Sequence, residues 1–142
     1  MIDLKRQGEL REAIELFFFA YRAFTTPPDQ ILAQRGLGRV HHRILYFVAR
    51  NPGIAVNALL GVLGVSKQAL NGPLRQLQEN GLIAARTAAH DRRVRQLELS
   101  EAGSALEAEL SGTQLEMLEK VFAGAEPEVE AAWRKVMGAV AG

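Results

Sequence analysis

Residues 54–99 decide the fold, and they read IAVNALLGVLGVSKQALNGPLRQLQENGLIAARTAAHDRRVRQLEL. Apolar residues recur at helical spacing in two short segments, about residues 55–61 and 66–80. A turn at residues 62–65 separates the segments, so the stretch predicts two helices joined by a tight turn and packed near a right angle. Their shared apolar interior is expected to consist of Leu59, Leu63, Val65, Leu70 and Leu74.

Three residues mark the turn and the ends of the second helix. Gly64 lies in the turn, where the backbone conformation favours glycine. Ser66 is a good N-cap, and Gly81 suits the left-handed conformation beyond the helix C-terminus. The outer face of this helix is expected to carry long or amide side chains and no acid, which suits contact with base edges and phosphates: Lys67, Gln68, Asn71, Arg75 and Gln76.

A β-hairpin is predicted directly after the second helix, with strands at about residues 82–86 and 93–99. The loop between them, residues 87–92, is polar and basic at its end. A basic hairpin tip can place a guanidinium in a DNA minor groove. We therefore predict a winged helix-turn-helix, a mostly α-helical fold with a two-stranded β-hairpin wing, that binds double-stranded DNA in a sequence-specific manner. The expected DNA-binding residues are Ser66, Lys67, Gln68, Asn71, Arg75, Arg92 and Arg93.

Two helices are predicted upstream of this region. The first runs from Glu9 to about Phe24, and the Pro27-Pro28 pair should end it because proline cannot donate to the helix ladder. A short helical piece through Ile31 and Leu32 is expected next, and a second helix at about residues 38–50. The first helix is apolar around more of its circumference than one buried face requires, which is typical of a helix that also packs on a partner subunit. Its aromatic residues include Phe17, Phe18, Phe19 and Tyr21.

Two more helices are predicted downstream. Ser100 is expected to cap a long helix, and Pro127 to lie in the first turn of the last one. We therefore predict a single domain over residues 1–142. In it, residues 9–35 and 101–142 would form dimerisation helices around a winged helix-turn-helix at about residues 38–100.

Charge is unevenly distributed along the chain. Residues 64–97 contain six basic and two acidic residues, whereas residues 98–142 contain three basic and nine acidic ones. Binding to nucleic acid depends on such a local basic surface, although the overall charge is only +1. The absence of cysteine excludes disulfides and thiolate metal sites. No apolar run is long enough to span a bilayer, and no secretory signal is recognisable, so a cytoplasmic location is expected.

The sequence contains no recognisable catalytic constellation, metal motif or phosphate-binding glycine loop, so we expect neither an enzyme nor a cofactor. His41 and His42 are adjacent on a predicted helix and point about 100° apart, which argues against a shared metal ion. His42 is instead a candidate for lining a ligand pocket, together with Arg43 and Tyr46. Arg35, Arg39 and Arg43 recur every four residues; they fit a solvated face, with an anion clamp as the alternative.

Several motifs resemble the MarR family of transcriptional regulators over nearly the whole chain. They are Gly36-Leu37, the helix-turn-helix, Gly81-Leu82-Ile83, Asp91-Arg92-Arg93 and the segment Leu97-Glu98-Leu99-Ser100-Glu101-Ala102-Gly103. The stretches His41-His42-Arg43 and Lys67-Gln68-Ala69-Leu70 resemble a proteobacterial subgroup that includes PetP-like regulators.

This resemblance implies a homodimer on a pseudo-palindromic operator, with Asp91 orienting the wing residue Arg93 in the minor groove. It also implies a pocket for a small anionic or aromatic effector between the dimer interface and the DNA-binding part.

The sequence departs from the usual pattern at Gly72-Pro73, inside the second helix of the pair, where a kink or irregular first turns are expected. Gly38 and Ala55 also stand where a capping Ser or Thr is common. A winged helix that binds another protein and no DNA is the alternative function.

Overall fold

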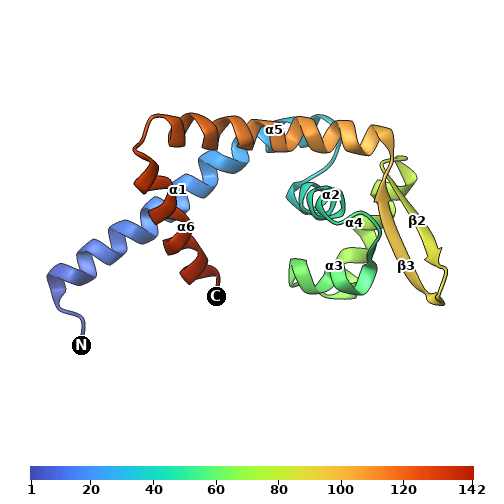
Figure 1. The fold of residues 1–142 in the computed structure, drawn as a ribbon, viewed down its shortest axis with the longest axis horizontal. Helices are drawn as coiled ribbons and strands as arrows, with labels where there is room; N and C mark the ends of the chain where they lie inside the picture. The colour runs from blue at the N-terminus through green and yellow to red at the C-terminus, as the bar shows by residue number, and fades with distance from the viewer.

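The computed structural model describes residues 1–142 as six helices and a three-stranded antiparallel sheet (Figure 1). The predicted fold, mostly α-helical with a hairpin directly after the helix-turn-helix, is confirmed. The helices are α1 (Leu4–Gln34), α2 (Arg39–Arg50), α3 (Val56–Leu63), α4 (Lys67–Glu79), α5 (Glu101–Ala123) and α6 (Pro127–Ala141). The strands are β1 (Ile54–Ala55), β2 (Ile83–Ala88) and β3 (Asp91–Leu99).

The long helix α5 connects two parts of the molecule (Figure 1). The helices α2, α3 and α4 and the sheet lie below one end of α5, while the N-terminal half of α1 extends away below the other end, where α6 folds back. Neither α6 nor the part of α1 before Thr25 contributes a buried residue. None of the six helices combines the length and apolar content needed to cross a membrane.

One hydrophobic core of 14 buried residues holds the helix-turn-helix, the sheet, the end of α1 and the start of α5 together. Burial of apolar surface provides most of the stabilisation in such a core. The residues that are no more than 1% exposed are Leu32, Ile44, Leu45, Val48, Leu59, Leu70, Leu77, Leu97 and Leu110.

The predicted helix ends are confirmed at three places. Ser66 Oγ accepts a hydrogen bond from the backbone N–H of Ala69 at 3.1 Å, and Ser100 Oγ accepts one from Gly103 at 3.0 Å. Gly81 has a φ of 73°, the left-handed conformation expected beyond α4. Each of these features depends only on residues close to it in the sequence, which is why the sequence alone predicts it.

The start of α5 packs closely on the base of the hairpin. Gly103 is buried, and a Cβ atom at this position would lie only 2.0 Å from the carbonyl oxygen of Leu82. That oxygen also accepts a hydrogen bond from the backbone N–H of Ser100 at 3.0 Å. Only glycine allows the backbones of α5 and residue 82 to approach this closely.

Pro27 and Pro28 lie inside α1, so the prediction that they end the first helix and that a separate short piece follows is wrong. A proline within a helix removes the hydrogen bond to the carbonyl four residues earlier. For Pro28 this is the carbonyl of Phe24, and Gln114 Nε2 of α5 donates a hydrogen bond to it at 3.2 Å. Pro28 is itself buried. Contact with α5 therefore compensates for a lost backbone bond and allows α1 to continue.

The sheet contains a strand, β1, that was not predicted. Ile54 lies opposite Leu97 and Ala55 opposite Gln96, so β1 pairs with β3 on the side away from β2. A strand of two residues is too short to show alternating hydrophobicity. Its formation depends on a partner about forty residues away, which local sequence does not reveal.

The hairpin strands are longer than predicted. β2 continues to Ala88 and β3 begins at Asp91, so the turn consists of residues 89–90 and the expected loop over residues 87–92 is wrong. The polar composition of this segment indicated a loop, but cross-strand pairing also accommodates polar side chains on a solvent-exposed ladder.

A bulge interrupts the hairpin close to its tip. Thr87 pairs with Arg95, but the next residue, Ala88, pairs with Asp91. Residues 92–94 therefore have no partner on β2. Bulges of this kind bend the strand and redirect side chains, and this one includes two of the predicted DNA-binding arginines.

The helix α4 is α-helical from its first residue through Gly72 and Pro73, so the irregular first turns expected here are not observed. Pro73 removes the backbone hydrogen bond to the carbonyl of Ala69. Ala69 is exposed. Its carbonyl can therefore bind water, which reduces the cost of an interior proline at this position.

Candidate nucleic-acid interface and adjoining cavity

A groove of about 370 Å³ lies between α4 and β3. Four of the predicted DNA-binding residues line it: Lys67, Asn71 and Arg75 from α4, and Arg93 from β3. Arg95 lines it as well, so four cationic side chains share one groove. None of its 12 lining residues is acidic. Such a groove concentrates positive potential and suits an anionic polymer.

The other three predicted DNA-binding residues lie outside this groove. Ser66, Gln68 and Arg92 are all exposed. The hydroxyl oxygen of Ser66 accepts the capping bond of α4, so it is already engaged. Gln68 and Arg92 have no hydrogen-bond partner within the chain and remain available to an external ligand.

Gln76 does not share the outer face of α4, so that expectation is wrong. The side chain is half-buried, and its Oε1 lies 2.9 Å from Nε2 of His41 in α2. Its amide nitrogen donates to the carbonyl of Gly36 at 3.3 Å. These contacts span 35 and 40 residues of sequence, and helical periodicity carries no information about them.

Asp91 holds Arg93 through three hydrogen bonds. Its Oδ1 accepts the backbone N–H of Arg93 at 2.9 Å and Nε at 3.2 Å, and its Oδ2 accepts Nη2 at 3.2 Å. These bonds hold the pKa of Asp91 below its usual value, and the side-chain bonds contribute more to this lowering than the backbone bond does. The Arg93 side chain is nevertheless 91% exposed. The carboxylate thus fixes the direction of a guanidinium that stays accessible.

Sequence reasoning missed three polar residues of the groove, Arg95, Gln78 and Asn57. Arg95 lies two positions after Arg93, and residues two apart point to the same side of a strand. That spacing is a signal that could have identified it. Asn57 belongs to the start of α3 and reaches the groove because β1 and β3 pair, which only the tertiary structure shows.

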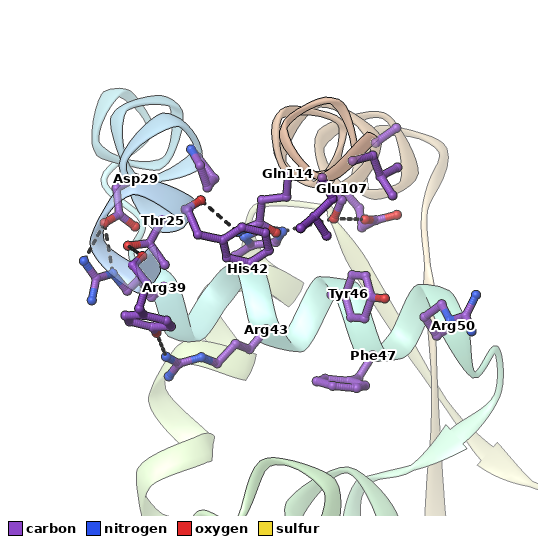
Figure 2. Close-up of a pocket in the computed structure, with 17 residues that line it drawn as sticks. Thr25, Asp29, Arg39, His42, Arg43, Tyr46, Phe47, Arg50, Glu107 and Gln114 are labelled. Atoms are coloured by element: carbon purple, nitrogen blue, oxygen red, sulfur yellow. Dashed lines mark hydrogen bonds and ion pairs between the residues drawn. The ribbon is translucent and has the colours of Figure 1, made fainter. Parts of the chain in front are cut away.

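A larger cavity of about 570 Å³ lies between α1, α2 and α5 (Figure 2). The three residues predicted to line an effector pocket, His42, Arg43 and Tyr46, all line this cavity. They come from one face of α2, as Figure 2 shows. The lining also includes the apolar residues Phe24, Phe47, Leu115 and Leu118.

Charged and aromatic side chains are linked at one side of this cavity. Arg39 forms an ion pair with Asp29 at 2.9 Å, and its hydrogen bond to Asp29 is the main cause of its raised pKa. The guanidinium of Arg39 also lies 5.5 Å from the centroid of the Tyr21 ring. Arg43 Nη2 donates to the hydroxyl oxygen of Tyr21. Arg35, Arg39 and Arg43 are all exposed, as a solvated face requires, and Arg39 and Arg43 also line this cavity.

His42 is buried at the cavity wall and connects α2 with α5. Its Nε2 lies 3.1 Å from Ser111 Oγ, and Ser111 in turn donates to Glu107. Because Ser111 uses its hydrogen for Glu107, Nε2 of His42 must carry the proton and donate. Burial lowers the pKa of His42, and the nearby Glu107 only partly offsets this effect. This environment therefore favours the neutral form of the ring.

Lowering the pH from about 7.5 to about 5 is expected to reduce the free energy of unfolding, partly through His42. The ordinary histidine pKa is 6.5, and burial holds that of His42 below it. Between these two values the unfolded chain binds a proton that the native state does not, so stability present above pH 6.5 is lost as the pH falls.

Urea unfolding at the two pH values measures this effect. His42→Gln should show a smaller loss of stability on acidification than the wild type. His90→Gln is the matched control, because His90 is exposed in the hairpin turn. An undiminished pH dependence in His42→Gln would contradict the assignment.

Comparison with known proteins shows that this chain is similar to transcriptional regulators over most of its length. Residues 35–94 match the sequence model of the MarR family. The HTH-type transcriptional regulator PetP of Rhodobacter capsulatus is 46% identical over 132 residues, which cover 93% of this chain and 80% of that protein.

Two solved structures show the same fold at low sequence identity. Streptococcus pneumoniae FabT, solved in complex with DNA, has a TM-score of 0.81 at 17% identity over 92% of this chain and 94% of its own. The S. aureus MepR–DNA complex has a TM-score of 0.72 at 19% identity over 89% and 93% of the two chains. The likeness therefore includes the flanking helices as well as the helix-turn-helix.

Proposed function

Because this chain belongs to the MarR family and is a transcriptional regulator of that family, we propose that it binds a pseudo-palindromic DNA operator as a homodimer. In this proposal α4 enters the major groove, where amide and guanidinium groups distinguish base pairs. The hairpin places Arg93 in the neighbouring minor groove, whose width sets the local potential. The DNA-bound structures of FabT and MepR support DNA binding by analogy of fold.

One observation carries the DNA-binding proposal: the cationic groove without any acid between α4 and β3. Lys67 and Arg75 on the helix and Arg93 and Arg95 on the strand supply two rows of positive charge. With α4 in the major groove and the hairpin in the minor groove, the sugar-phosphate strand that separates the two DNA grooves would run between these rows and present phosphates to both. Of the nine acidic residues after Leu97, Glu98 lies on β3 and forms an ion pair with Arg86, and the other eight lie on α5, on α6 or at the start of α6. None of the nine lines this groove.

The apolar surface of α1 supports the homodimer. Ile14, Phe17, Phe18 and Tyr21 are 66%, 49%, 60% and 44% exposed in the single chain. Further exposed apolar residues lie on α6, including Trp133 at 40%. Contiguous apolar surface of this kind is rare on a stable monomer. We assign dimerisation to α1, α5 and α6, and DNA binding to residues 38–100.

Selection from a random duplex pool tests both parts of this proposal. The wild-type protein should enrich sequences with two inverted half-sites, centred about 10 base pairs apart, because each dimer presents two copies of α4. Sedimentation of the enriched complex should give two chains per duplex. Absence of any enrichment would favour a protein-assembly module, and one chain per duplex would contradict the homodimer.

We also propose that the 570 Å³ cavity binds a small anionic aromatic molecule that weakens DNA binding. Asp29 already neutralises Arg39, whereas Arg43 and Arg50 have no carboxylate partner and can attract an anion. Phe24 and Phe47 can pack on an aromatic ring. The cavity lies against α2, which packs on the recognition helix α4, so occupation can alter the position of α4.

The coupling between effector and DNA must be reciprocal. We expect each ligand to weaken the other by about 1–3 kcal/mol, because linkage requires equal effects in both directions. Calorimetry with a series of aromatic carboxylates, in the presence and absence of the enriched duplex, measures this coupling. Equal carboxylate affinity under both conditions would remove the regulatory proposal and leave DNA binding intact.

A further inference from the structure

Two side-chain hydrogen bonds connect α4 to the first turn of α2 and to the segment between α1 and α2, and both involve Gln76. Oε1 of Gln76 lies 2.9 Å from His41 Nε2, and its amide nitrogen donates to the carbonyl of Gly36 at 3.3 Å. The remaining packing of α4 on α2 is apolar and involves the buried Leu70, Leu74 and Leu77. Apolar packing is largely non-directional, whereas hydrogen bonds fix both distance and angle.

The direction of each bond in this chain is fixed. Gly38, the N-cap of α2, has no side chain, and its backbone N–H donates to Nδ1 of His41 at 2.9 Å. Nδ1 must therefore be an acceptor, which places the ring proton on Nε2 and makes Oε1 of Gln76 the acceptor of that proton. The amide nitrogen of Gln76 is left free to donate to Gly36. His41 is only 8% exposed, so water competes little for these bonds.

We propose that His41 and Gln76 are positioning residues that set the orientation of the recognition helix α4 relative to α1, and thereby determine sequence specificity. This inference rests on the proposed DNA-binding function. Gln76 follows the groove-lining Arg75 directly. Its two bonds therefore hold the DNA-facing part of α4 to the first turn of α2 and to Gly36, just after the end of α1. In the proposed dimer, α1 belongs to the interface, so the spacing of the two recognition helices depends on this connection.

Loss of this connection should affect specific binding more than general binding. Base-edge hydrogen bonds tolerate little displacement, whereas attraction between cations and phosphates persists when a helix moves slightly. Gln76→Met removes both bonds while preserving side-chain length, charge and helix propensity. Gln30→Met is the matched control, because Gln30 is exposed on α1 and has no side-chain hydrogen bond.

The experiment measures dissociation constants for two probes: one duplex enriched by the wild type from a random pool, and the unselected pool itself. Gln76→Met should reduce the ratio of the two affinities roughly tenfold, the effect of losing one or two net hydrogen bonds. Its affinity for the unselected pool and the ratio for Gln30→Met should remain within about twofold of wild type. His41→Leu should reproduce the loss, and His41→Gln, which again presents an acceptor beside a donor, should restore most of the ratio.

Three outcomes would overturn the proposal, and they differ from one another. An unchanged ratio in Gln76→Met shows that the pair does not set specificity. Equal weakening of both probes, with a lower urea midpoint, shows that the pair only stabilises the fold. Failure of the wild type to enrich any duplex overturns the DNA-binding function as well, which separates that failure from the first two.

Discussion

Replacing Gly103 with alanine is expected to lower the free energy of unfolding by about 3 kcal/mol, at the upper end of what overpacking usually costs. The added Cβ would lie 2.0 Å from the Leu82 carbonyl oxygen and 2.9 Å from its carbonyl carbon. Neither atom can rotate away as a side chain can, and the hydrogen bond from Ser100 holds the same carbonyl in place. The start of α5 would have to separate from the base of the hairpin.

Urea unfolding of Gly103→Ala against wild type measures this cost. Gly112→Ala is the matched control, because it makes the same change in the same helix with nothing within 4 Å of the new atom. It should increase stability by about 0.5–1 kcal/mol, since alanine favours helix over glycine. Equal unfolding midpoints for the two variants would show that the packing between α5 and residue 82 is looser than described.

Replacing Arg93 with alanine is expected to weaken binding to the operator and to random duplex alike, by about 1.5–3 kcal/mol for each charge-assisted hydrogen bond to DNA that the variant cannot form. The side chain is exposed, lines the groove and is held by two side-chain hydrogen bonds to Asp91. The slope of log affinity against log salt should decrease by about 0.9 per chain, because one fewer counterion is released. Asp91→Ala should weaken binding less, since the guanidinium loses its orientation and keeps its charge.

Changes in the recognition helix should have a different pattern. Gln68→Ala or Asn71→Ala should cost about 1–3 kcal/mol of binding free energy on the operator and little on random duplex, because amides distinguish bases and carry no charge.

Arg134→Ala is the control for Arg93→Ala, since it also removes an arginine, one that pairs with Glu130 on α6, far from the groove. A salt titration of each variant against both duplexes makes the comparison. Wild-type behaviour of Arg93→Ala on both would refute the role of the wing.

The parts of the fold that were predictable depend on local requirements. Ser66 and Ser100 cap helices within three residues of themselves, and Gly81 ends α4 through its own backbone conformation. The basic positions that line the groove were also identifiable, because helix and strand periodicity determine which side chains share a face. The cavity residues His42, Arg43 and Tyr46 lie on one face of α2 for the same reason.

The features that were not predictable depend on interactions between distant segments. α1 continues through its prolines because Gln114, ninety residues later, bonds the freed carbonyl of Phe24. Gln76 turns inward because His41 offers it a partner in α2. His42 faces Ser111 across 69 residues of sequence. In each case a tertiary hydrogen bond outweighs a local preference, and a single sequence gives no sign of that bond.

The way α5 meets its neighbours also limits how the length of this chain can vary in evolution. Gly103 touches the hairpin base and Gln114 touches α1. Gln114 lies eleven positions after Gly103, a step that advances the helix by three turns and only about 20° more. One inserted residue between them would rotate Gln114 by about 100° and shift it by about 1.5 Å, so α5 could no longer satisfy the hairpin and α1 together. An insertion in the turn at residues 89–90 disturbs neither of them. Descendants of this gene should therefore differ in length at the hairpin tip and retain an α5 of constant length.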